Sequence, residues 1–312
     1  MIALGTRVTL RYRLPPGHSH PMTDVIGELV DNGHVVSVRA SDGRVVSIAA
    51  DRVIALKALG PRPIRTLEIR SLERAAADGW PGIEQEWIDG WLLRAGRGFT
   101  GRANSATPIE PHASASSLEA ITGWFARRSL PAVLLLPDRL LDVPPGWTSR
   151  DETLVMAADI ERLELPSESI AVVSETPDDE WLGLYNYRGT ALPDGAVEVI
   201  RAVRDGVAGF ARIGSAASEM LAIGRAAVTW GSDGRRWVGL TAVEVARAHR
   251  RNGLGTRICG ELVGWGRDQG ATHAYLQVAA SNVGAIAMYR GLGFVEHHGY
   301  RYAAAPHVSA NT

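Results

Sequence analysis

Hydrophobic and polar residues alternate along the N-terminal part of the chain. The alternation has the period of half-buried β-strands and runs through four stretches, at 6–14, 24–33, 34–43 and 44–56. Asn32-Gly33 and Asp42-Gly43 lie between stretches, as expected for hairpin turns. Short strands at this spacing predict that residues 1–60 form a small all-β barrel domain of the Tudor-like type.

The pattern changes to mixed helix and strand over residues 61–165. A helix is predicted at 67–80, and a second helix follows Ser117, which we expect to cap it. Residues 86–96 and 101–109 read as strands, and the apolar runs at 131–138 and 152–160 read as buried strands. This region is therefore predicted to be a second, α/β domain. It contains no evident catalytic cluster.

Residues 166–312 are predicted to form a third, α/β domain. Thr176 and Pro177 have the form of a helix start. Strands are predicted at 206–214, 220–231 and 235–246. The last of these runs into a helix whose apolar residues recur at helical spacing, with Gly270 suited to its C-terminal end.

The turn before that helix has the composition of an anion-binding site. The first N–H groups of a helix have no internal partner, and the helix dipole adds partial positive charge. Gly253 and Gly255 allow close approach of the backbone, and Arg250 and Arg251 add charge. Neither the Rossmann fingerprint nor the P-loop motif is present. On these residues alone, a phosphate site and an ordinary loop both remain open.

Two ordered motifs resemble the GNAT superfamily of N-acetyltransferases. The first is R-x-x-G-x-G after a V-x-V strand, at Arg250–Gly255. The second is N-x-x-A, Tyr and L-G-F, at Asn282, Ala285, Tyr289 and 292–294. The resemblance covers about residues 174–305. It implies an α/β fold with the mixed α+β sheet of GNAT proteins, acetyl-CoA as cosubstrate, and transfer of an acetyl group to a primary amine.

The resemblance also implies roles for individual residues. Val243 and Val245 would lie along the pantetheine arm, in a V-shaped opening between two parallel strands. The diphosphate would be held by Arg250, Arg251, Asn252, Gly253, Leu254, Gly255 and Thr256. Tyr289 would protonate the departing thiolate, or else be a packed aromatic residue. Asn282 would cap a helix or, with Ala285, contact the cofactor.

The general base is less evident from the sequence. Ribosomal-protein N-acetyltransferases, which resemble this segment, carry Glu where this chain has Gln277, and an amide cannot accept the proton. Glu244 is the candidate base, and an outward-facing strand carboxylate is the alternative. His249 is a further option, while the pair His297-His298 is expected only to border the acceptor cleft.

Composition narrows the remaining choices. The net charge of −1 does not support a broad nucleic-acid-binding surface. No apolar run is long enough to span a membrane, so we expect a cytoplasmic protein. Cys259, the only cysteine, is expected to be buried and inert, and His18 and His20 make no metal site. The acceptor is expected to be a small-molecule or peptide amine, bound between an active and a degenerate GNAT-like half. The N-terminal domain is a candidate for binding a protein partner.

Two other functions remain open. One is a non-catalytic acyl-CoA sensor, which the glutamine at 277 would suit and an intact Tyr289 argues against. The other is a nucleic-acid-binding barrel protein, which the balanced charge disfavours.

Overall fold

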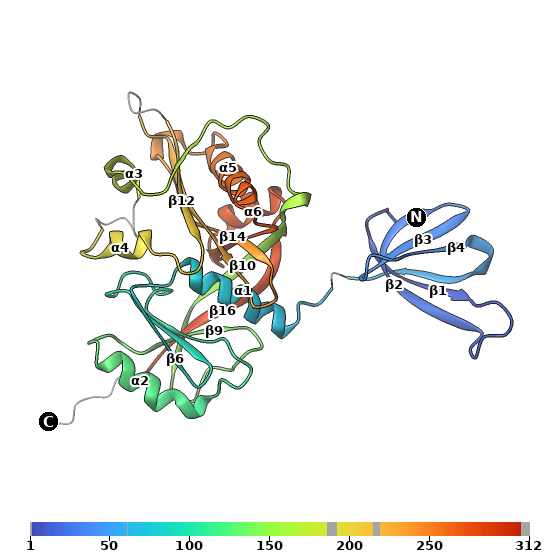
Figure 1. Ribbon diagram of the computed structural model, residues 1–312, viewed down its shortest axis with the longest axis horizontal. Helices are drawn as coiled ribbons and strands as arrows, with labels where there is room; N and C mark the ends of the chain where they lie inside the picture. The colour runs from blue at the N-terminus through green and yellow to red at the C-terminus, as the bar shows by residue number, and fades with distance from the viewer. Residues whose placement is uncertain (1, 61, 186–191, 215–218, 307–312) are drawn as a thin grey trace. The chain divides into compact units, whose positions relative to one another are not determined.

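The computed structural model describes residues 2–60, 62–185, 192–214 and 219–306. The chain divides into two compact units, Met1–Pro63 and Ile64–Thr312. The first unit is blue in Figure 1, and the second takes the remaining colours. The further division expected at residue 165 falls inside the second unit and stays a prediction.

The first unit is a five-stranded antiparallel sheet with the order β4-β3-β2-β1-β5. Its strands are β1 Arg7–Arg13, β2 Met22–Asn32, β3 Val35–Ala40, β4 Val45–Ala49 and β5 Val53–Ala58. Alternate apolar residues such as Val8, Leu10 and Leu29 face one buried core, as the period of two requires. The stretch 44–56 forms two strands rather than one, because a 3₁₀ turn at Ala50–Arg52 interrupts it.

The second unit is built on one mixed sheet of eleven strands, which confirms the mixed α/β fold. The sheet order is β11-β12-β13-β14-β15-β10-β16-β9-β8-β7-β6. The strands are β6 Glu84–Ile88, β7 Trp91–Ala95, β8 Ala106–Pro108, β9 Val133–Pro137, β10 Thr148–Asp159, β11 Val172–Ser174, β12 Val207–Ile213, β13 Ala222–Trp230, β14 Arg236–Val245, β15 His273–Ala279 and β16 Val295–Ala304. The helices are α1 Thr66–Gly79, α2 Leu118–Ala126, α3 Asp179–Leu184, α4 Ala196–Arg201, α5 Leu254–Asp268 and α6 Val283–Gly291.

Strands from the two halves of this unit are interleaved. Two pairs are parallel, β8 with β9 and β14 with β15, and each pair is joined through a helix, α2 or α5. Between these pairs, β10 lies between β15 and β16, and β16 in turn pairs with β9. In Figure 1 the red strand β16 accordingly lies beside the green strands β9 and β10. Each half therefore completes its part of the sheet with a strand of the other.

Three local expectations need correction. The stretch 86–96 belongs to the hairpin β6–β7 rather than to one strand, because Asp89 and Gly90 take positive φ angles of 44° and 82°. Ser117 precedes α2 but does not cap it, since its hydroxyl donates to Asp89 instead. The helix expected near Thr176 begins at Asp179, where the side chain of Asp178 accepts the N–H of Trp181.

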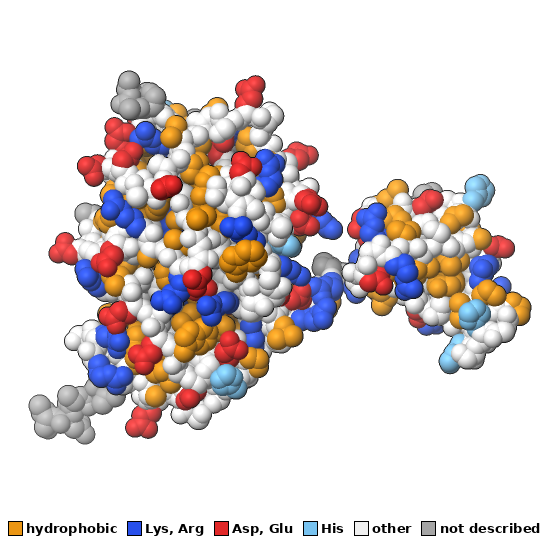
Figure 2. Space-filling view, viewed as in Figure 1, with side chains coloured by type: hydrophobic (Ala, Val, Ile, Leu, Met, Phe, Trp, Pro, Cys, Tyr) orange, Lys and Arg blue, Asp and Glu red, His pale blue; other side chains and the backbone are white. Residues whose placement is uncertain are grey.

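The distribution of charged side chains on the surface and the length of the helices agree with the near-zero net charge and the lack of a long apolar run in the sequence. On the face shown in Figure 2, acidic and basic side chains of the second unit are interspersed rather than segregated. Within the described ranges, no helix has both the length and the apolar character needed to cross a membrane.

Close packing between β14 and β15 yields a stability prediction. Gly239 lies opposite Tyr275, and a Cβ at this glycine would be 2.2 Å from the tyrosine Cζ. Because the ring is buried, Gly239→Ala should lower the free energy of unfolding by about 1–3 kcal/mol. Urea denaturation measures this. Gly264→Ala in α5 is the control, since that Cβ would enter open space and should stabilise the helix slightly. Equal stability of the two variants would contradict the packing argument.

Candidate active site

The parallel strands β14 and β15 pair over only part of their length. Their ladder ends at Leu240 and Leu276, after which the two chains diverge. The divergence coincides with a β-bulge in β14, where the register to β13 shifts and Ala242 takes a φ of 52°. A bulge bends its strand and increases its twist, so the last residues of β14 turn away from β15. The V-shaped opening implied by the resemblance is therefore present between these strands.

A cavity of about 680 Å³ occupies this opening, with walls from β14, β15, α6 and the start of α5. It lies at the carboxyl ends of two parallel strands, the usual position of ligand sites in α/β sheets. Its lining includes eight of the residues expected from the sequence, namely Val243, Glu244, Val245, Arg250, Gly255, Asn282, Ala285 and Tyr289. Val243 and Val245 line this cavity and also pack against the hydrophobic core.

The start of α5 presents unpaired amides at one end of the cavity. The Arg257 N–H donates to the Gly253 carbonyl, so the amides of Leu254, Gly255 and Thr256 precede the first helical hydrogen bond. Gly253 is the N-cap and has a φ of 77°. A Cβ at Gly255 would approach the Sδ of Met288 to 3.0 Å. The turn therefore places donors and partial positive charge where a diphosphate could bind.

Of the expected diphosphate loop, only Arg250 and Gly255 line the cavity. Arg251, Asn252 and Thr256 are exposed, and they are not among the lining residues. Arg251 has a φ of 64°. Arg250 folds back, so that its Nε donates to the Val245 carbonyl at 3.1 Å. The loop is thus held to the end of β14.

Glu244 and Tyr289 are the two residues for which the sequence suggested proton transfer, and both line the cavity. Burial raises the pKa of Glu244, while Arg250, whose Nη2 lies 3.7 Å from the Glu244 Oε2, opposes the rise. Burial also raises the pKa of Tyr289, and negative charge at Cys259 and Glu244 would raise it further. Tyr289 is therefore a neutral hydroxyl donor at physiological pH.

The structure also shows the surroundings of Asn282 and Cys259. Asn282 caps α6, because its side chain accepts the Ala285 N–H at 3.2 Å, and it also lines the cavity. Cys259 is buried in the core, where burial raises the pKa of its thiol to about 12, so it is not a nucleophile.

None of the three histidines that the sequence suggested for the site, His249, His297 and His298, lines the cavity. The Nε2 of His249 lies 3.0 Å from Glu219, outside the set of lining residues. His298 was expected at the border of the acceptor cleft but is buried, with its Nε2 2.9 Å from Glu73 of α1. Burial, reinforced by the charge of His298, lowers the pKa of His297 to about 3. Neither member of the pair lines the cavity.

Two lining residues, Arg102 and Tyr185, come from segments outside the two motifs, and no pattern in the sequence pointed to them. Arg102, from the loop before β8, donates from Nη1 to the Oε1 of Gln277 at 2.8 Å. Tyr185 follows α3 and stacks on Trp181. Arg102 and Gln277 are 175 positions apart. No local pattern signals such a contact, which exists only because the two halves share one sheet.

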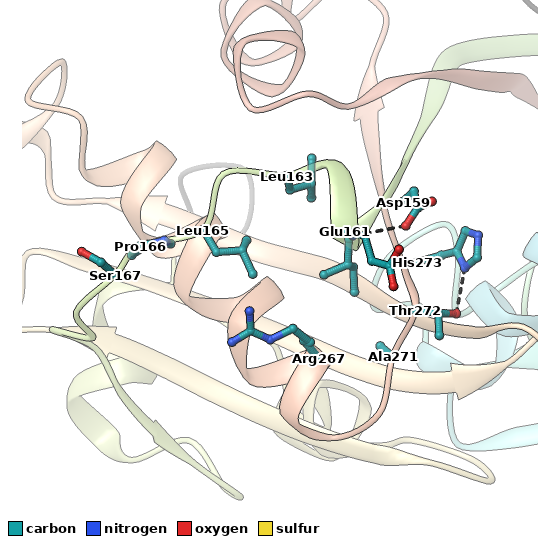
Figure 3. A pocket seen from close by; sticks show the side chains of 11 residues that line it. Asp159, Glu161, Leu163, Leu165, Pro166, Ser167, Arg267, Ala271, Thr272 and His273 are labelled. Atoms are coloured by element: carbon teal, nitrogen blue, oxygen red, sulfur yellow. Dashed lines mark hydrogen bonds between the residues drawn. The ribbon is translucent and has the colours of Figure 1, made fainter. Parts of the chain in front are cut away.

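A second, larger cavity of about 860 Å³ lies at the other end of β15 (Figure 3). His273, at the start of β15, points toward Thr272, whose hydroxyl is 2.8 Å from its Nδ1. The cavity is otherwise bordered by the segment 159–167 and by the C-terminal end of α5, including Arg267. It has no helix N-terminus and no divergent strand pair, so it lacks the features of the first cavity.

Comparisons with known proteins agree with this geometry. A family model described as "Probable histone acetyltransferase Rv0428c C-terminal" matches residues 66–303, and one described as "Rv0428c N-terminal Sm-like domain" matches residues 2–57. The chain belongs to the Rv0428c family. The small β-domain is thus confirmed, and the family model describes it as Sm-like where the strand pattern had indicated a Tudor-like type.

Individual relatives extend over most of the chain. A protein of Mycobacterium tuberculosis named "Probable histone acetyltransferase Rv0428c" is 40% identical over 310 residues, which are 99% of this chain and 98% of the relative. An N-acetyltransferase of Bacillus subtilis, YobR, is 28% identical over 75% of this chain and 98% of its own. The structure of a GCN5-related N-acetyltransferase from Kribbella flavida has a TM-score of 0.50 and 19% identity, and covers 76% of this chain and 95% of its own. It supports the fold. This Rv0428c-family member is therefore an acetyltransferase of the GNAT type.

Proposed function

We propose that this protein transfers the acetyl group of acetyl-CoA to a primary amine by direct attack of the amine on the thioester. The observation that carries the proposal is the divergence of β14 from β15 beside the unpaired amides of α5. A pantetheine arm can hydrogen-bond to a strand edge exposed in this way, as an added strand would. The diphosphate would then reach Gly255 and its neighbouring amides.

Two residues of the cavity would handle the protons of the reaction. The amine nitrogen forms a bond to the carbonyl carbon while the carbon–sulfur bond breaks, so one proton must leave the nitrogen and the sulfur must end as a thiol. Glu244 would accept the first proton, directly or through water, and Tyr289 would donate the second. The raised pKa of Tyr289 keeps this donor protonated, and the raised pKa of Glu244 makes it a better proton acceptor.

The name of the mycobacterial relative supports an amine acceptor, since a histone offers lysine side chains. Purified protein should release free thiol from acetyl-CoA when an amine is added, and mass spectrometry should find the acetylated amine. Saturable binding of acetyl-CoA without turnover on any amine would instead favour the acyl-CoA sensor.

The role of Glu244 predicts a pH dependence. A general base must be ionised, so activity should fall as the pH falls through the pKa of Glu244, which lies above the ordinary glutamate value of about 4.3. In Glu244→Gln, the rate at neutral pH should fall about tenfold, below the range of about 10²–10⁴ for an obligatory base, since water can relay the proton. The acidic limb of the pH–rate profile should also disappear. Glu84→Gln, which removes an exposed partner of Arg128, is the control. An unchanged acidic limb in Glu244→Gln would assign the base elsewhere.

A further inference from the structure

Arg102 is a cation in the wall of the active-site cavity, and it has no carboxylate partner among the described residues. Its Nη1 donates to the amide oxygen of Gln277, which carries no charge. Its guanidinium lies over the ring of Trp80, with Cζ 5.3 Å from the ring centroid. Among the ion pairs of the described residues, none includes Arg102. Gln277 and the Trp80 ring hold the group in place, and its other N–H donors bond to none of the described residues.

Two buried arginines lie behind Arg102 and add to the positive charge. Arg225 lies over the same indole, with Cζ 4.8 Å from the Trp80 centroid. It donates to the carbonyls of Ile200 and Ala202 and to the hydroxyl of Thr241. Arg94 donates to a carbonyl and to hydroxyls of Ser105 and Thr107.

The charges around these arginines do not cancel. All three arginines contact Trp80: Arg102 and Arg225 lie over its ring, and Arg94 donates to its carbonyl. Burial lowers the pKa of both Arg94 and Arg225, and the charge of Arg102 lowers them further. Within the described ranges, neither buried arginine forms an ion pair. Glu73 partly offsets Arg94 but is itself bonded to His298.

The other ionisable groups near Arg102 do not neutralise it. Burial raises the pKa of Tyr275, Tyr300 and Tyr302, so all three phenols are uncharged. Glu244 lines the same cavity but is paired with Arg250, at the end near α5. Among the described lining residues, Glu244 is the only carboxylate, and it pairs with Arg250 rather than with Arg102.

We propose that Arg102 binds a carboxylate of the acceptor, so that the acceptor is a small amine bearing a carboxylate, as in a free amino acid. This inference rests on the proposed function. A planar guanidinium matches a carboxylate with two parallel hydrogen bonds. Arg102, Glu244 and Tyr289 line one cavity of about 680 Å³, which must also hold the thioester. The carboxylate and the reacting amine must therefore lie close together, which disfavours a lysine flanked by uncharged peptide groups.

The test compares L-amino acids with their matched L-amino-acid amides as acceptors. The amine of an amino-acid amide is less basic than that of the free acid, so more of it is unprotonated at neutral pH. Intrinsic reactivity therefore favours the amide. A preference of the enzyme for the acid must then come from binding of the carboxylate. We expect kcat/KM of the wild-type protein to be about tenfold or more higher for the preferred acid than for its amide. In Arg102→Gln the ratio should fall to near one through the KM of the acceptor, with the Kd of acetyl-CoA unchanged.

Two further variants separate this role from a structural one. Gln277→Glu is nearly isosteric and places a carboxylate against Arg102, so it should abolish the preference for acids while leaving the fold intact. Arg97→Gln is the matched control, because Arg97 is exposed on the same loop and pairs with Glu198, outside the lining residues; it should keep the preference.

Equal rates on acids and amides, faster transfer to a capped lysine peptide, or a preference that survives both Arg102→Gln and Gln277→Glu would overturn the inference while leaving the acetyltransferase intact. Absence of transfer to every amine would contradict the proposed function itself.

Discussion

Replacing Tyr289 with phenylalanine should lower kcat about a hundredfold, at the low end of what a positioned general acid contributes. The loss should fall on kcat because the variant removes only the hydroxyl. The ring would still meet the edge of Phe294, whose centroid is 6.2 Å away, so packing in α6 should be preserved. Steady-state thiol release measures the rate, and calorimetry should give an unchanged Kd for acetyl-CoA.

The pH–rate profile of the wild-type protein is a second test of Tyr289 as the acid. An acid must be protonated to act, and burial raises the pKa of Tyr289 above the ordinary tyrosine value of about 10. The rate should therefore show no loss from this group as the pH rises from 7 to about 10. If Tyr289→Phe retains the wild-type kcat, the tyrosine is a packed aromatic residue and the thiolate leaves without its help.

Replacing Gly253 with valine should weaken acetyl-CoA binding about a hundredfold. Gly253 caps α5 with a φ of 77°. A β-branched residue in this conformation carries backbone strain of about 1–3 kcal/mol. We expect the backbone to relieve that strain by rotating, which would turn the adjacent amides away from the ligand. The Kd from calorimetric titration is the readout.

Gly234→Val is the matched control for this variant. Gly234 has a φ of 80° and open space around its Cβ position, in the turn between β13 and β14. The strain should be similar, so stability should fall to a comparable extent while the Kd stays at the wild-type value. Equal loss of binding in both variants would point to general destabilisation rather than to the amides of α5.

The sequence carries much of the site because its motifs are local. A strand, a left-handed glycine and an amphipathic helix occupy consecutive residues from β14 to α5, and each has its own pattern. Asn282 caps one short helix, α6, and Tyr289 lies within it, so a single local pattern places both residues. For these residues, local conformation determines position, and the resemblance supplies candidate roles.

Other parts of the fold depend on contacts that no local pattern encodes. The bulge at Ala242 arises within an apparently regular strand pattern, and alanine gives no sign of a positive φ. The position of β10 between β15 and β16 follows from pairing across distant segments. Arg102 lies in a glycine- and arginine-containing loop that reads as unremarkable, and it gains its place through Gln277 and Trp80. The cavity wall formed by Arg102 and Gln277 could be described only once the tertiary structure was known.

A calorimetric titration with CoA and, separately, with pantetheine tests the central claim most directly. The two ligands share the arm that would lie between β14 and β15, but only CoA carries the diphosphate that would meet the α5 amides. We predict saturable binding of CoA, and binding of pantetheine at least about a hundredfold weaker, as expected for the loss of several charge-assisted hydrogen bonds. Equal affinities, or no heat of binding with CoA at millimolar concentration, would contradict the account.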